Sequence, residues 1–248
     1  MCTVVILRRS DHRWPILVAA NRDEMAGRPW LPPGRHWDDR PNVVAGQDEL
    51  AGGSWLGIND EGVVAAILNR QGTLGPEEGK RSRGELVLEA LDHADAVDAA
   101  KALIHLAATA YRPFNMMIAD NRDAFWLRSD GQTVRAAPLD DGVSMLTAFD
   151  LNDPNDPRIR AYLPKFRDSA IPDPEAGNWG EWKKLLATPA PYASTDREAG
   201  LTFQLESGFG TRSSALIALP SVDHPEIEPV FLFAPGPPDQ ASFRPVVS

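Results

Sequence analysis

The sequence predicts an α+β layered fold, with two β-sheets and helices outside them. Several short apolar segments between residues 2 and 69 predict strands, and the first of them is rich in β-branched residues. Two helical segments follow, and strand-like segments then return. The 248 residues include 22 prolines, which favours many ordered loops over long helices.

The first strands can be placed from hydrophobic patterning. Residues 2–9 are almost continuously apolar, which predicts a strand buried on both faces. Polar residues 10–13 predict a turn, and residues 15–21 return as the second strand of a hairpin that ends at residues 21–24. Glycine-bearing turns separate three further predicted strands, at residues 42–46, 54–58 and 63–69.

Helices are predicted from capping signals. Ser82 and Glu85 have the spacing of a capping box, which predicts a helix over residues 83–92. Asp95 is the predicted N-cap of a second helix, whose apolar residues follow the helical period as far as Ala107. Pro164 predicts a kink or break in a later helix. The remaining predicted elements are strands at 114–120, 124–129, 132–137, 143–149, 214–219 and 229–233, and helices at 158–169 and 180–187.

Composition excludes several classes of protein. Lys and Arg number 25 against 35 Asp and Glu, a net charge of −10 that disfavours nucleic-acid binding. No apolar run approaches the ~20 residues that span a bilayer, and no secretory signal is recognisable, so we expect a cytoplasmic protein. The single cysteine excludes an intramolecular disulfide and a Cys-rich zinc site. Without repeats or a clear linker, residues 1–248 are expected to form a single domain.

Cys2 is the first candidate for chemistry, because of its position. Removal of Met1 would leave the Cys2 thiol beside a free α-amine, which titrates near ~7.7–8.0 and can serve as its general base. A retained Met1 would remove that base. The competing interpretation is a small apolar residue that opens a buried strand.

Polar residues follow the second strand. Asp23 could accept a hydrogen bond from the new N-terminal amine, and Arg22 could favour the Cys2 thiolate. Asn69 ends a later buried strand, where its amide could donate to a developing oxyanion. The alternatives are a turn closed by its own salt bridges at residues 21–24 and a strand-terminating asparagine at Asn69.

Four motifs together resemble the NRDE family, also called the transport and Golgi organisation 2 family. They are MC at residues 1–2, NRDE at 21–24, GGSW at 52–55 and GTRSS at 210–214. The resemblance covers residue 2 to about residue 219. It implies the N-terminal nucleophile hydrolase fold, a four-layer αββα sandwich, and a distant similarity to choloylglycine hydrolases such as bile-salt hydrolase and penicillin V acylase.

The resemblance also implies roles for particular residues. Cys2 matches the nucleophile, Asp23 the aspartate that holds the amine, and Asn69 the oxyanion asparagine. Arg212 falls near an arginine that closes the site from a late strand, and Arg22 has a weaker match. One departure is Ala148, which stands where the hydrolases have a second asparagine.

The loop predicted at residues 29–40 is expected to overhang the site. His36 and Trp37 in this loop, with Asn21 and Arg22, are the candidate substrate-binding residues. His36 is also the one histidine considered as a haem ligand. No motif for covalent haem, a P-loop or a dinucleotide fingerprint is present, and the five histidines lack zinc-site spacing.

Two functions from different classes follow. The first is a cysteine amidohydrolase that requires no cofactor and acts on a linear amide C–N bond of a small molecule or acyl conjugate. The second is a carrier that uses the same cleft without turnover, for which the resemblance implies haem or acyl-CoA and lipid ligands. Ala148 favours the carrier, whereas Cys2, Asp23 and Asn69 favour the enzyme.

Overall fold

The structure is a computed structural model that describes residues 2–190 and 199–246. The chain divides into two compact units. Met1–Gly27 and Asp141–Pro245 form the first, and Arg28–Asp140 contributes the second. Within the described residues, each unit has one antiparallel sheet and two α-helices, so the predicted α+β class is confirmed. The expected single domain stays a prediction.

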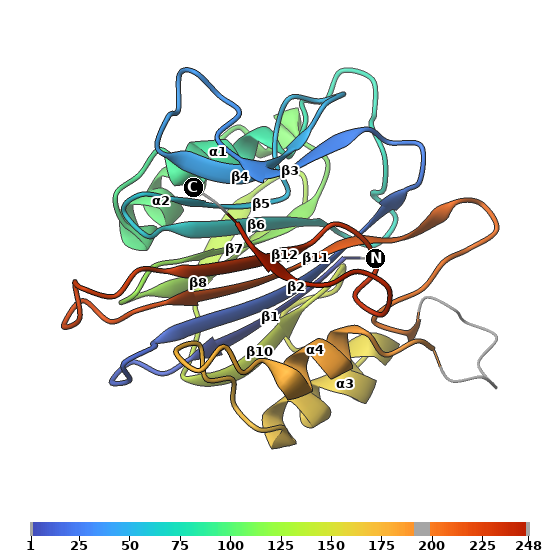
Figure 1. Ribbon diagram of the computed structural model, residues 1–248. Helices are drawn as coiled ribbons and strands as arrows, with labels where there is room; N and C mark the ends of the chain where they lie inside the picture. The colour runs from blue at the N-terminus through green and yellow to red at the C-terminus, as the bar shows by residue number, and fades with distance from the viewer. Residues whose placement is uncertain (1, 191–198, 247–248) are drawn as a thin grey trace. The chain divides into compact units, whose positions relative to one another are not determined.

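The first unit is a six-stranded sheet in the order β10-β1-β2-β11-β12-β13. Figure 1 shows α3 and α4 lying along the β10, β1 and β2 part of this sheet. The elements are β1 (Thr3–Arg8), β2 (Ile16–Met25), β10 (Gly142–Leu146), α3 (Pro157–Asp168), α4 (Gly180–Leu186), β11 (Phe209–Leu219), β12 (Val230–Ala234) and β13 (Arg244–Pro245).

Alternate residues of these strands form the core beneath α3 and α4. Val5, Leu17 and Leu216 pack in one cluster with Phe166 and Trp182 from the helices. Because side chains alternate along a strand, one set of residues faces the helices and the other set faces away from them. This alternation decides which polar side chains meet at the end of the sheet.

The second unit is a seven-stranded sheet whose strands follow chain order, β3 to β9. Helices α1 and α2 pack with its buried residues in a second core cluster. The elements are β3 (Trp30–Gly34), β4 (Val43–Asp48), β5 (Leu56–Asn59), β6 (Val64–Asn69), α1 (Glu85–Leu91), α2 (Ala96–Leu103), a short 3₁₀ helix (Ala108–Ala110), β7 (Phe114–Ala119), β8 (Ala124–Ser129) and β9 (Val134–Pro138).

Strand β2 is longer than the sequence predicts. Residues 21–24 continue the strand rather than ending it, because β11 pairs with β2 as far as Met25 opposite Phe209. Part of the loop expected at residues 29–40 is likewise β3, an edge strand that pairs with β4 alone. An edge position tolerates Pro32 and Pro33, since one side of the strand needs no hydrogen-bond donors.

Two helix predictions also need correction. The capping box at Ser82 and Glu85 does not form, because the Ser82 hydroxyl accepts from the backbone of Gly84 and α1 begins at Glu85. Pro164 lies inside α3, which continues unbroken to Asp168, so the predicted break is wrong and the predicted kink stays a prediction. Asp95 does cap α2, accepting from the Asp98 N–H at 2.7 Å. Within the described residues, no helix is both long enough and apolar enough to cross a membrane.

Candidate functional site

Cys2 lies against the backbone of β2. Thr3 pairs with Asn21 in the antiparallel β1–β2 ladder, which confirms the predicted hairpin and brings Cys2 beside the next residues of β2. The Cys2 sulfur accepts from the Asp23 N–H at 3.3 Å and donates to the Asp23 carbonyl oxygen at 3.5 Å. The thiol is half-buried. Both contacts are to the main chain, so the sheet itself sets the position of the sulfur.

The Asp23 carboxylate is buried on the helix-facing side of the sheet. Thr211 donates its hydroxyl to Asp23 Oδ1 at 2.8 Å, and Arg158 Nη1 lies 3.3 Å from Asp23 Oδ2. A bulge in β11 explains the first contact. Thr211 pairs with Asp23 and Ser213 with Arg22, so the residue between them is the extra one and Thr211 can face the carboxylate.

Arg158 crosses from α3 to the start of β1. Its Nη1 also donates to the Thr3 hydroxyl at 2.9 Å, and its guanidinium lies over the Phe203 ring, 5.5 Å from the ring centroid. Asp156, the N-cap of α3, accepts from the Arg158 N–H at 2.7 Å. The second Asp156 oxygen accepts from the Thr147 hydroxyl. A connected polar chain therefore runs from the end of β10 to the residues beside Cys2.

The electrostatic setting of Cys2 combines effects of opposite sign on the pKa of its thiol. Burial raises the pKa of the Cys2 thiol, and the negative charge of Asp23 raises that pKa further. Arg22 lowers the pKa of Cys2, as expected, but by less than these two effects raise it. The net effect is a pKa of the Cys2 thiol above its ordinary value.

Arg22 stands on the face of the sheet that lies away from α3 and α4. Its guanidinium is 5% exposed and lies 3.8 Å from the Glu24 carboxylate. Ser213, its partner on β11, shares this face, and within the described residues the buried Ser213 hydroxyl has no hydrogen-bond partner. By the register of β1 and β2, Cys2 lies next in the same row.

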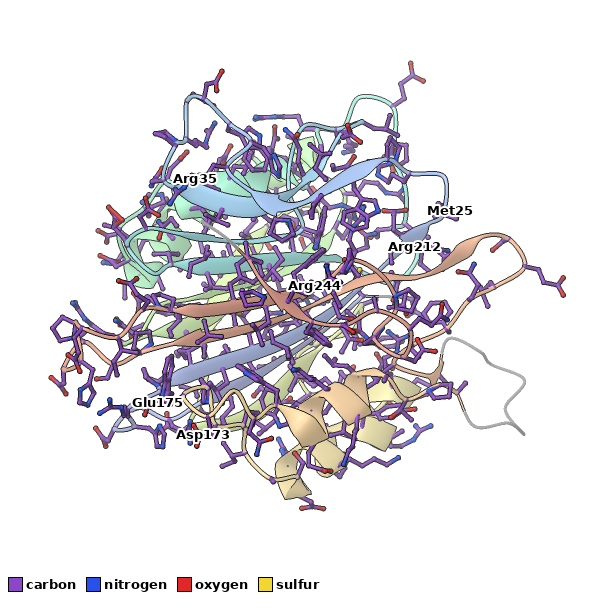
Figure 2. The ribbon with its side chains drawn as sticks, in the orientation of Figure 1. Met25, Arg35, Asp173, Glu175, Arg212 and Arg244 are labelled. Carbon is purple, nitrogen blue, oxygen red and sulfur yellow. The ribbon has the colours of Figure 1, made fainter. Side chains whose placement is uncertain are left out.

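Arg212 is the bulge residue, and its side chain holds the end of the β2–β11 ladder. It donates to the Glu24 carbonyl at 3.0 Å, to Gln204 Oε1 at 2.6 Å and to the Gly208 carbonyl. Figure 2 shows Arg212 and Met25 at the same end of this ladder. The guanidinium thus reaches the β2 backbone one residue past Asp23.

Asn21 is committed to contacts within the first unit. Its amide nitrogen donates to the carbonyl oxygens of Leu186 and Leu201 at 3.0 and 2.7 Å, and its oxygen accepts from the Ser214 hydroxyl at 2.5 Å. The residue is 2% exposed. These contacts tie β2 to the end of α4, and a substrate-binding role for Asn21 stays a prediction.

The remaining candidates lie in the second unit. Asn69 ends β6, where it pairs with Phe114. His36 Nε2 donates to the Pro32 carbonyl at 2.8 Å, and Trp37 Nε1 donates to the Gly52 carbonyl at 2.9 Å. Because side chains alternate along β6, the side chain of Asn69 is on the same face of the strand as that of Ile67. Ile67 packs against the core cluster that includes residues of α1 and α2. The expected convergence of these residues with Cys2 stays a prediction.

Ala148 and the nearby Asn152 follow β10. Ala148 is buried, with 3% of its surface exposed. Asn152 lies in the following loop, in the left-handed region with φ of 58°. Its side-chain oxygen accepts from the Met145 N–H at 2.8 Å, and its amide nitrogen donates to the Ser144 hydroxyl at 3.1 Å. Asn152 therefore completes the hydrogen bonding of β10.

Sequence reasoning missed Arg158 and Thr211. A signal for Arg158 was present, because Arg158, Tyr162 and Phe166 recur every four residues and so share one face of a helix. An arginine in an otherwise apolar stripe predicts a buried partner. No comparable signal marked Thr211, since its orientation depends on a bulge that forms only when β11 pairs with β2.

Comparison with known proteins identifies the family. The family model described as transport and Golgi organisation 2 matches residues 1–224. The chain belongs to this family. None of the curated protein sequences compared with it is significantly similar.

Solved structures show the fold of this member of the transport and Golgi organisation 2 family. A Caenorhabditis elegans ortholog of N-acylethanolamine-hydrolyzing acid amidase matches with a TM-score of 0.57 and 15% identity, over 87% of this chain and 92% of that one. A variant of the conjugated bile acid hydrolase from Clostridium perfringens matches with a TM-score of 0.53 and 12% identity, over 100% and 97%. The chain therefore has the α+β fold of N-terminal nucleophile hydrolases, with two antiparallel sheets and helices.

Proposed function

We propose that this chain, after removal of Met1, is a cysteine amidohydrolase that cleaves a linear amide C–N bond in a small molecule or acyl conjugate. The observation that carries the proposal is the position of the Cys2 sulfur on the Asp23 backbone, with the Asp23 carboxylate fixed by Thr211 and Arg158. A rigid strand end of this kind suits a nucleophile, because the support leaves little freedom to the reacting atom.

The proposed reaction has two steps. In the first, the Cys2 α-amine accepts the thiol proton, the sulfur attacks the carbonyl carbon, and the C–N bond breaks as the leaving amine takes that proton. In the second, water attacks the thioester, releases the carboxylic acid and returns a proton to the sulfur. Asn69 is proposed to donate to the oxyanion, and Asp23 to hold the amine. The mechanism requires no cofactor.

Met1 removal is decisive in this proposal, because the raised pKa of Cys2 leaves the thiol dependent on an adjacent base. Intact-mass measurement establishes whether the protein begins at Cys2.

We then expect the Met1-free protein to hydrolyse an N-acylethanolamine or a conjugated bile acid, the amide classes named for the two similar structures. The Cys2→Ala variant should lose this turnover, while Ser10→Ala, an exposed change in the β1–β2 turn, should retain it. Equal turnover by Cys2→Ala and the Met1-free protein would refute the proposal.

A carrier is the second candidate, favoured by the buried apolar Ala148. Its proposed ligands are haem, an acyl-CoA or another lipid conjugate, bound in the cytoplasm without turnover. Because His36 Nε2 donates to Pro32, Nδ1 is the ring nitrogen with a lone pair for iron. A carrier should bind haem or acyl conjugate equally well with Cys2→Ala, and His36→Ala should weaken only haem binding.

A further inference from the structure

Arg158 is among the most deeply buried charged residues of the described chain. Its side chain is 2% exposed, and that of its partner Asp23 is fully buried. Removing an ion pair of this kind from water is costly, so specific contacts must offset the desolvation penalty. Arg158 makes them with Asp23, with the Thr3 hydroxyl and with the Phe203 ring.

These contacts end on the residues that locate the Cys2 sulfur. Thr3 follows Cys2 in the chain, and Asp23 supplies both backbone atoms that contact the sulfur. One guanidinium nitrogen, Arg158 Nη1, therefore contacts side chains on both strands that hold the thiol. Asp156 anchors the start of α3 to Thr147, which fixes the direction from which Arg158 enters.

We propose that Arg158 is a positioning residue for Cys2, acting through the Asp23 carboxylate and the Thr3 hydroxyl. This inference rests on the proposed function only in treating Cys2 as the reacting group. Arg158 has two effects: it neutralises the Asp23 charge beside the thiol, and it holds β1 and β2 in register where Cys2 begins.

The charged groups around the thiol give the expected electrostatic signs. Asp23 raises the pKa of Cys2. Arg22, whose side chain is on the other face of β2 from that of Asp23, lowers the pKa of Cys2. Without the Arg158 charge, Asp23 acts on the thiol uncompensated, so the pKa of Cys2 rises further. Replacing Asp23 by Asn removes the negative charge and has the opposite effect.

The experiment measures the rate of Cys2 alkylation by iodoacetamide as a function of pH, with intact mass as readout. Cys2 is the only cysteine, so each modified molecule reports this site. Arg158→Met should move the midpoint of the pH profile upward by at least about half a unit, and Asp23→Asn should move it downward. The matched control is Arg160→Met, on the same helix but exposed to solvent, which should leave the midpoint unchanged.

A folded Arg158→Met protein with the midpoint of Arg160→Met would overturn the proposal. If Arg158→Met does not fold, Asp23→Asn is compared with the double variant Asp23→Asn/Arg158→Met, from which both buried charges are gone. The double variant should then have the higher midpoint, and equal midpoints would overturn the proposal. Alkylation needs no amide turnover, so an inactive protein that shows these shifts contradicts the proposed function and leaves the role of Arg158 intact.

Discussion

Arg158 Nη1 lies 3.3 Å from Asp23 Oδ2, and the ion pair is sealed from solvent. The two residues are 135 positions apart in the chain, and the pair joins α3 to β2. Thr211 holds the other Asp23 oxygen from β11. The carboxylate is thus a junction of one helix and two strands beside the only cysteine.

Asp23→Ala should destabilise the protein strongly. The substitution leaves the buried Arg158 guanidinium without the Asp23 carboxylate, and breaking such a pair costs about 3–5 kcal/mol. Urea unfolding followed by circular dichroism measures this loss. Glu181→Ala, which breaks the exposed ion pair with Lys184 on α4, should cost much less. Equal losses for the two variants would contradict a buried ion pair at Asp23.

Cys2 should be alkylated more slowly in the folded protein than in the unfolded protein while Met1 is retained. The thiolate is the reactive form, and the raised pKa of Cys2 reduces its population at pH 7. In the folded protein, the alkylation rate should continue to increase as the pH rises beyond about 8.5, the ordinary pKa of cysteine. Iodoacetamide labelling with and without urea checks this, and faster labelling of the folded chain at pH 7 would contradict it.

The same shift has a consequence for stability. The pKa of Cys2 is higher in the folded than in the unfolded state, so the thiol contributes to folding stability. This contribution is fully present at pH values below the pKa that Cys2 has in the unfolded state. That contribution is lost as the pH rises through the folded value. The stability of wild type relative to Cys2→Ala should therefore decrease at alkaline pH, as measured by urea unfolding at two pH values. An unchanged difference would argue against the raised pKa.

Asn21→Ala should lower stability by about 1–3 kcal/mol, because it leaves two buried carbonyl oxygens and the Ser214 hydroxyl without their partner. Thermal unfolding measures the loss, and the exposed Asn155→Ala is the control. If Asn21 instead serves only the substrate, the variant should keep its stability and show a raised KM in the amidase assay.

Gly53→Ala should disrupt the second unit. A Cβ at Gly53 would lie 2.4 Å from the Gly84 carbonyl carbon, where the GGSW segment meets the start of α1. Backbone on both sides cannot give way cheaply, so we expect a loss of at least about 2 kcal/mol in unfolding experiments. Gly27→Ala has no atom within 4 Å of the new Cβ and is the matched control. A neutral Gly53→Ala would show that the close approach is absent.

Much of the second unit followed from local patterning. The strands at residues 42–46, 54–58 and 63–69 were predicted from apolar runs between glycine turns, and β4, β5 and β6 lie within or close to these ranges. Hydrophobic period and turn chemistry are local properties, so they can be seen without the tertiary structure. The β1–β2 hairpin and the Asp95 cap were visible for the same reason.

The sequence by itself determined the α+β class, the family motifs and the candidate pair Cys2 and Asp23. Only the tertiary structure decided how Asp23 is used. Pairing with β11 extends β2 through residues 21–24, and the bulge at Arg212 aligns Thr211 with the carboxylate. Arg158 reaches the same carboxylate because α3 packs on the sheet. Burial and long-range pairing set these contacts and raise the pKa of Cys2, and neither is a property of any short segment of chain.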